Sequence, residues 1–146
     1  MTRPGSWLTV LKKSMSNDSL YHYKATILRV IDGDTVEARV DLGFKIHFTQ
    51  KFRLLNIDAP EIRGEKKNEG RAAASHLIKL ICSHAANLED GKLPDGALAV
   101  IQIETLKDKT GKYGRYLCRL WGLDQDGSMV DINQKMVHDG HAQSSD

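Results

Sequence analysis

Alternating apolar and polar residues predict three consecutive β-strands in the first half of the chain. Apolar side chains recur at every second position of these segments, and β-branched and aromatic residues are frequent in them, as in half-buried strands. The turn Asp32-Gly33-Asp34 separates the first strand from the second, and Gly43 separates the second from the third. The three predicted strands, which together form a meander, are residues 23–31, 35–40 and 44–57.

The second half of the chain changes between helical and strand periodicity. Apolar residues between 69 and 84 recur at spacings of three and four, which indicates an amphipathic helix. Short apolar runs then predict two more strands, and Asp131 can cap a final short helix that Gly140 ends. The predicted elements are a helix over 69–84, a strand over 98–103, a polar loop over 107–114, a strand over 116–121 and a helix over 131–139.

This order of elements predicts an α+β, mainly β fold. Three strands, a helix, two strands and a short C-terminal helix match a five-stranded OB-fold barrel with a helix between strands three and four. We expect this domain to span residues 23–142. An N-terminal tail, mobile or loosely docked, would occupy residues 1–22, and a C-terminal tail would occupy residues 143–146.

Composition limits the function classes without selecting one. The chain has 146 residues, 40% of them hydrophobic and 27% charged, as expected for one globular domain in water. A formal net charge of +2 is only weakly basic, so any surface that binds nucleic acid must be local. Cys82 and Cys118 have no zinc-site spacing, and we expect both to be buried thiols. No membrane span or signal peptide is found, so we expect a cytoplasmic monomer, or a secreted one if a signal has been removed.

Four polar clusters carry the candidate chemistry: Asp34, Arg53, the segment Asp58-Ala59-Pro60-Glu61, and the segment Lys112-Tyr113-Gly114-Arg115. Each is ordinary alone, since turns commonly contain Asp and Gly and a strand commonly exposes an Arg. Together they provide what phosphodiester hydrolysis needs. Asp34 and Asp58 could hold a hard cation with the help of a backbone carbonyl. Glu61 could activate water, while Arg53 and Arg115 could neutralise a phosphorane.

Three segments, in this order, resemble the signature segments of the staphylococcal nuclease family. They are Ile31-Asp32-Gly33-Asp34-Thr35-Val36, Phe52-Arg53-Leu54-Leu55-Asn56-Ile57-Asp58-Ala59-Pro60-Glu61 and Lys112-Tyr113-Gly114-Arg115. The resemblance implies an endonuclease that hydrolyses DNA or RNA with low sequence specificity and leaves 3′-phosphate ends.

The resemblance also implies a role for each matching residue. Asp34, Asp58 and the Ala59 carbonyl would bind one Ca²⁺ ion, with Mg²⁺ the less expected metal. Glu61 would be the general base, and Arg53 and Arg115 would contact the reacting phosphate. Lys112 and Tyr113 would contact substrate phosphates.

A non-catalytic OB-fold module that binds single-stranded nucleic acid or a protein partner is the alternative function. Such a module should expose aromatic side chains along its strands for base stacking. Aromatic residues make up only 6% of the chain, and the alternation predicts that Phe44, Phe48 and Phe52 face the core. All candidate acids and arginines are present, which favours the nuclease.

Overall fold

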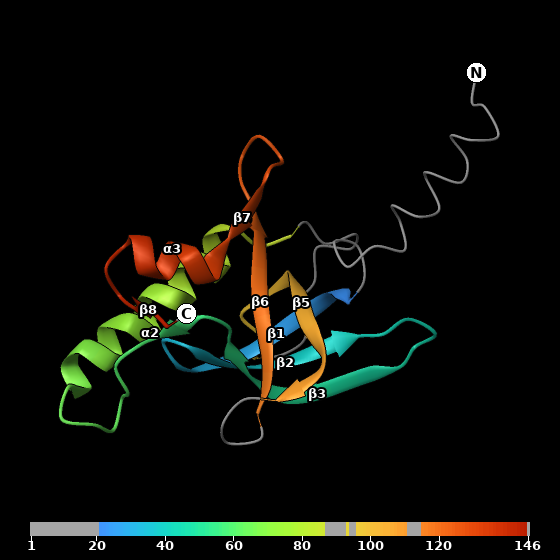
Figure 1. Cartoon of the computed structure of the whole chain (residues 1–146). Coiled ribbons are helices and arrows are strands. Elements are labelled where there is room, and N and C mark those ends of the chain that lie inside the picture. The colour runs from blue at the N-terminus through green and yellow to red at the C-terminus, as the bar shows by residue number, and fades with distance from the viewer. Residues whose placement is uncertain (1–20, 87–92, 94–95, 111–114, 146) are drawn as a thin grey trace, which may run out of the picture.

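Five strands close into a barrel, and two helices lie together on one side of it (Figure 1). The structure is a computed structural model that describes residues 21–86, 93, 96–110 and 115–145. Within these ranges, no helix is long and apolar enough to cross a membrane. The strands are β1 (His22–Asp32), β2 (Thr35–Asp41), β3 (His47–Leu54), β4 (Ile57–Asp58), β5 (Ala99–Thr110), β6 (Tyr116–Leu123), β7 (Met129–Asp131) and β8 (Gln143–Ser144). The helices are α2 (Lys67–Ser83) and α3 (Ile132–His138).

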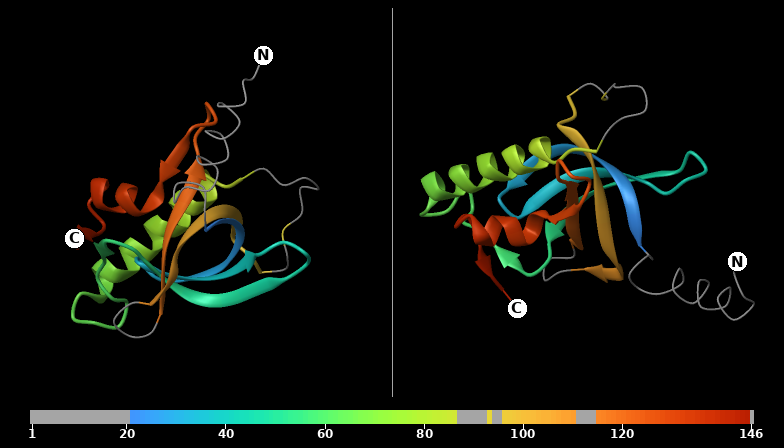
Figure 2. Two further views of the ribbon diagram at one scale, coloured as in Figure 1. Left: turned by 45° about the vertical axis from the view of Figure 1, so that its right-hand side comes forward. Right: turned by 90° about the horizontal axis from the view of Figure 1, so that it is seen from above.

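The strand order confirms the predicted OB-fold barrel. The order in the main sheet is β3-β2-β1-β5-β6-β7, and an additional pairing of β3 with β6 closes the ring, which Figure 2 shows as strands curving around a common core. That closing pair is parallel and joins Phe52, Arg53 and Leu54 to Tyr116, Leu117 and Cys118, respectively. Helix α2 lies between the third and fourth strands of the barrel, as predicted.

Along each barrel strand, side chains face the core and the outside of the barrel alternately. Phe52 and Leu54 of β3 are buried in the core, whereas Arg53 between them is only partly buried. The apolar side of α2, including Leu77 and Ile81, packs on the same core. Full burial of each such side chain contributes about 1.5–3 kcal/mol. The core therefore fixes which side chains of β3 face outward.

A buried asparagine ties α3 to the closing strands. The Asn133 side chain is inaccessible to solvent; its Oδ1 accepts a hydrogen bond from the Leu120 amide at 3.1 Å. Its Nδ2 donates to the carbonyls of Leu55 and Cys118, both at 3.1 Å. Asn133→Ala is expected to lower the free energy of unfolding by about 2–4 kcal/mol, because each buried polar group left unpaired costs about 1–3 kcal/mol. Urea denaturation measures this loss.

Gln134→Ala is the matched control for this prediction. Gln134 follows Asn133 in the same helix, but its side chain is exposed. Its replacement should leave the free energy of unfolding within about 0.5 kcal/mol of the wild-type value, as is usual for surface positions. Equal urea midpoints for the two variants would show that Asn133 does not stabilise the closed barrel.

The third strand is shorter than predicted, and the prediction that Phe44 and Phe48 face the core is wrong. Strand β3 begins at His47, not at residue 44, because Phe44 and Lys45 have positive φ angles of 58° and 63° and form the turn after β2. Phe44 is 96% exposed and Phe48 is 38% exposed, so of the three only Phe52 is buried in the core. This hairpin turn projects away from the two helices (Figure 2). Alternation alone did not separate a core strand from a hairpin that extends beyond the core.

Two other predicted segments also differ from the structure. The predicted loop 107–114 is β-strand up to Thr110, because β5 and β6 continue as an antiparallel pair in which Thr110 lies opposite Tyr116. The predicted C-terminal tail begins with β8, which pairs with β4. Of the predicted N-terminal tail, residues 1–20 lie outside the described residues. Backbone hydrogen bonds, which side-chain polarity does not encode, extend the ordered structure at these places.

The cysteines are both free thiols but differ in environment. Cys118 of β6 is buried, as predicted, and burial raises the pKa of its thiol. Cys82 in the last turn of α2 is exposed, so the expectation of burial was wrong there. Its helical spacing placed it beside Ile81, which is in the core, but one position around a helix turns the side chain by about 100°. No function is required of either thiol by these positions.

A cluster of three side chains, those of His76, Asp139 and His141, links the segment after α3 to α2. His76 Nε2 lies 2.7 Å from Asp139 Oδ2, and the ring of His76 stacks on the ring of His141 with centroids 4.3 Å apart. The hydrogen bond with His76 is the main cause that lowers the pKa of Asp139. These contacts hold the end of α3 against α2.

Candidate active site

Asp34 lies in the tight turn between β1 and β2 and is held on both carboxylate oxygens. It is 7% exposed. Its Oδ1 accepts from the Thr35 hydroxyl at 3.0 Å, and its Oδ2 accepts from the Ala59 amide at 2.9 Å. The preceding Gly33 allows this approach, because a Cβ there would lie 2.7 Å from the Cβ of Ala73 and 2.9 Å from that of Ala59. The turn and the segment after β4 thus form one rigid corner.

Arg53 bridges the two candidate metal-binding carboxylates. Its Nη1 lies 3.1 Å from Asp34 Oδ2, and its Nη2 donates to Asp58 Oδ1 at 3.1 Å. Nη1 is buried and has no partner with hydrogen-bond geometry, although it is close to Asp34. Asp58, at the end of β4, has a side chain that is 67% exposed. The two carboxylates therefore converge on one cationic group at the edge of solvent.

Glu61 projects from a loop that two other residues hold in place. The amide of the next residue, Ile62, donates to Asp32 Oδ1 at 3.2 Å. From the other side, Gly70 of α2 packs directly on the Glu61 backbone. A Cβ at Gly70 would overlap the Glu61 carbonyl oxygen and would lie 2.8 Å from the Ile62 nitrogen. Glu61 itself is exposed, so its carboxylate is available to solvent and substrate.

One cleft of about 500 Å³ collects most of the predicted site. Arg115, directly before β6, and Leu117 of β6 line it beside the closing pair of strands. Of the eight residues predicted from the sequence, six line this cleft, and Lys112 and Tyr113 lie outside the described residues. The six are Asp34, Arg53, Asp58, Ala59, Glu61 and Arg115. Residues of four strands and of the turns and loops beside them thus meet at a single concave surface.

The cleft has the oxygen donors that a hard cation takes. Asp34 and Asp58 already share one cation, the Arg53 guanidinium, so both carboxylates are directed toward one positive charge. Within the described ranges, no three His, Cys, Asp or Glu side chains gather as a metal site. Two carboxylates and the carbonyl of Ala59 are fewer than the six to eight ligands of Ca²⁺, so water or phosphate oxygens would have to supply the others.

The sequence did not identify the residues that hold the site in shape. Asp32 was assigned only to turn chemistry, yet it lines the cleft and binds the loop that carries Glu61. Gly70 was only one residue of the helix predicted over 69–84, and no role was assigned to it. A glycine in the first turns of a helix, where Ala is preferred by about 1 kcal/mol, was the available signal of a close contact.

Comparisons with known proteins identify the family of this chain. A family described as "Staphylococcal nuclease homologue" matches residues 51–146, about two thirds of the chain. An uncharacterized protein of Methanocaldococcus jannaschii is 24% identical over 132 residues, which cover 86% of this chain and 60% of that protein. The chain thus spans less than two thirds of the length of this relative. The family match and the closed five-stranded barrel show that the chain belongs to the family of staphylococcal nuclease homologues.

Proposed function

We propose that this protein is a calcium-dependent nuclease that hydrolyses phosphodiester bonds of DNA, RNA or both with low sequence specificity. Its family membership indicates a nuclease-like or nucleic-acid-binding role. The observation that carries the finer proposal is the convergence of Asp34 and Asp58 on Arg53 in the cleft that Glu61 and Arg115 also line. A binding surface alone would not need a carboxylate pair where phosphate has to approach.

Each side chain has a part in the reaction that its position supports. Glu61, exposed on a loop held at Ile62, takes the proton from the attacking water. Arg53 and Arg115 donate to the phosphate oxygens on which negative charge develops. Asp34 and Asp58 would hold Ca²⁺, with the Ala59 carbonyl as a further ligand. The bound ion would supply positive charge to the same phosphate oxygens.

Cleavage assays with purified protein test this proposal. Single-stranded DNA, duplex DNA and RNA would each be incubated with Ca²⁺, with Mg²⁺ or with a chelator. We expect cleavage in Ca²⁺, less in Mg²⁺ and none in the chelator, since Ca²⁺ accepts the irregular oxygen set of this cleft more readily than Mg²⁺ does. Equal cleavage in the chelator would refute metal dependence, and no cleavage in any condition would refute the nuclease.

A second candidate function is binding of single-stranded nucleic acid without cleavage. The exposed rings of Phe44 and Phe48 now support it, because they are the kind of stacking surface that the sequence did not predict. Phe48 also lines a second cleft, of about 380 Å³, together with Tyr21, Tyr23 and Tyr116. Binding of an oligonucleotide that is never cleaved, with any of the metals above, would favour this function.

Gly70→Ala is expected to lower kcat about 10-fold to 100-fold and to lower the free energy of unfolding by about 1–3 kcal/mol, the usual cost of overpacking. The added methyl group would overlap the Glu61 carbonyl, so the loop must move and displace the general base. Displacement of a reacting group by about 1 Å can cost as much as 100-fold in rate. The helix itself gains up to about 1 kcal/mol from Ala, which offsets only part of the strain. Steady-state cleavage rates and urea denaturation measure the two effects.

Gly64→Ala is the control, because it adds the same methyl group to the same loop without a clash. The nearest atom to a Cβ there is the Glu61 Cβ at 3.8 Å, an ordinary contact. Its kcat should stay within about twofold of the wild-type value. If Gly70→Ala also cleaves at the wild-type rate, the close packing of α2 does not position Glu61.

A further inference from the structure

The outer face of the β2–β3 hairpin carries basic side chains in line with Arg53. Positions of the same parity on one strand face the same side, so Lys51 lies beside Arg53 on β3, about 7 Å along the strand. On β2, Arg39 pairs with Thr49 of β3 and therefore lies one step further from the cleft than Lys51. The three residues Arg53, Lys51 and Arg39, here called the cationic lane, run from the cleft along the hairpin.

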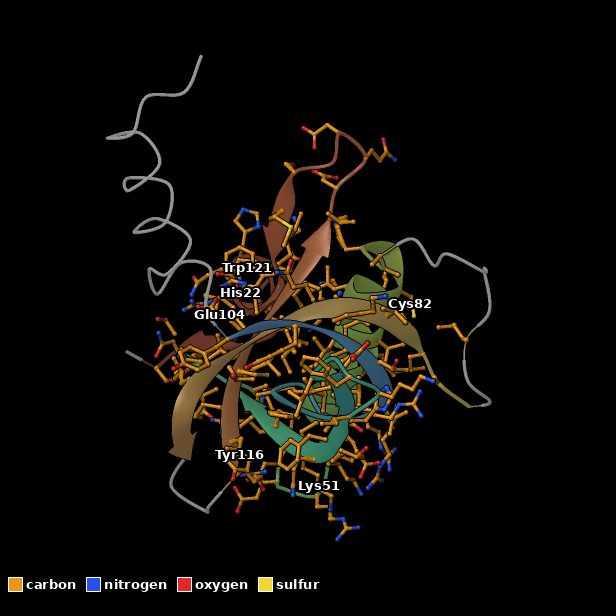
Figure 3. All side chains as sticks on the ribbon, turned by 90° about the vertical axis from the view of Figure 1, so that its right-hand side faces the viewer. His22, Lys51, Cys82, Glu104, Tyr116 and Trp121 are labelled. Carbon is orange, nitrogen blue, oxygen red and sulfur yellow. The ribbon has the colours of Figure 1, made fainter. Side chains whose placement is uncertain are left out.

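Two members of the cationic lane lack an acidic partner among the residues that the structure describes. Lys51 is exposed and makes no ion pair there, and it lies at the surface near Tyr116, at the start of β6 (Figure 3). Arg39 is partly buried, and its Nε is buried without a hydrogen-bond partner. A buried donor without a partner is costly, so an acceptor from water or from a bound molecule would stabilise the Arg39 guanidinium.

The acidic residues on this face are already engaged. Glu37 lies opposite Lys51 in the strand register, but its carboxylate accepts from Arg29 Nε at 3.1 Å. Asp41, the next acidic residue on β2, accepts from the Gly43 amide at 2.9 Å in the hairpin turn. Glu37 and Asp41 therefore interact with other donors, and neither forms an ion pair with Lys51 or Arg39.

We propose that the cationic lane binds the backbone phosphates of the nucleotides that flank the bond to be cleaved. The inference rests on the proposed function, because it takes Arg53 as the contact for the reacting phosphate. Lys51 would bind the adjacent phosphate and Arg39 the one after it. Successive positions about 7 Å apart along an extended β-strand suit the spacing of phosphates in an extended single strand. Contacts to phosphate carry no sequence information, which agrees with low specificity.

Binding measurements without cleavage test the lane directly. Fluorescence anisotropy of a labelled single-stranded oligonucleotide, in chelator, would be recorded over a range of salt concentrations for the wild type, Lys51→Gln, Arg39→Gln and the double variant. Each lost phosphate contact should reduce the slope of log Kd against log salt by about 0.7. We expect that loss for each single variant, and about twice that loss for the double variant, equally on DNA and RNA.

Lys45→Gln is the matched control, since Lys45 is an exposed lysine on the same hairpin but lies in its turn, far along the strand from Arg53. It removes the same charge, and its slope of log Kd against log salt should equal that of the wild type. A second control is an oligonucleotide with an uncharged methylphosphonate at the linkage next to the bond to be cleaved. The wild type should lose affinity for it, whereas Lys51→Gln should lose no more.

The outcomes separate the lane from the proposed function. Cleavage of a nucleoside p-nitrophenyl phosphate, which has no flanking phosphate, should be unchanged in Lys51→Gln and Arg39→Gln, while KM for an oligonucleotide should rise. If the wild type cleaves but both variants keep its salt slope, the lane is refuted and the nuclease stands. If the wild type cleaves nothing but the slopes fall, the nuclease is refuted, and Lys51 and Arg39 bind phosphates on a surface that does not cleave them.

Discussion

Glu61→Gln is expected to reduce kcat by about 10²–10⁴-fold, the usual contribution of a general base. The amide has nearly the shape of the carboxylate but cannot accept the proton from water. Glu61 is exposed, and the described contacts of this residue are made by its backbone, so the fold should not change. Binding of an oligonucleotide in Ca²⁺ should stay close to the wild-type value. Single-turnover cleavage, anisotropy and urea denaturation measure the three quantities.

Glu65→Gln is the control for this variant, because Glu65 is an exposed acid in the same loop but does not line the cleft. It should cleave at the wild-type rate. A Glu61→Gln protein with wild-type kcat would mean that another group takes the proton. Asp32 would then be the first candidate to replace, as it lines the same cleft.

Arg53→Gln should have two opposite effects, a kcat lower by about 10²–10³-fold and tighter binding of Ca²⁺. The rate falls because a donor to the developing phosphate charge is lost. The affinity for Ca²⁺ rises because the guanidinium now lies 3.1 Å from an oxygen of Asp34 and from one of Asp58. A cation placed between these carboxylates must overcome repulsion from Arg53, and the glutamine removes it. Calorimetric titration with Ca²⁺, in the absence of substrate, measures the second effect.

Arg71→Gln provides the comparison, since Arg71 is an exposed arginine on α2 that lies outside the cleft. It removes the same charge from the protein and should alter neither kcat nor the affinity for Ca²⁺. Weaker Ca²⁺ binding by Arg53→Gln would argue that the guanidinium orients the carboxylates for the metal and does not compete with it.

The sequence predicted those parts of the fold that depend on local periodicity. The helix expected over 69–84 is α2, and the strands expected over 23–31 and 35–40 are β1 and β2 with small shifts of their ends. The errors lie where the chain leaves the core. Alternation continues through Phe44 and Ile46, but these side chains are exposed because the hairpin projects past the barrel. No local pattern records how far a sheet extends beyond its core.

The predicted site depended on residue types and their order along the chain, and six of the eight residues line one cleft. Their catalytic roles stay predictions. What the sequence could not provide was the support of these residues. The bond from Ile62 to Asp32 and the contact of Gly70 with Glu61 each join segments that only tertiary packing brings together. The Arg53 bridge between two acids likewise depends on side-chain conformations.

The parallel pairing of β3 with β6 makes the order of folding matter for function. Asp34, Arg53 and Glu61 come from the first half of the chain, whereas Arg115 joins them only when Phe52 pairs with Tyr116. Contacts between residues so distant in sequence require closure of a large loop and form slowly. The β1–β2 hairpin and α2 can develop before that step. Recovery of hydrolysis during refolding would therefore time the closure of the barrel, while circular dichroism would follow the earlier events.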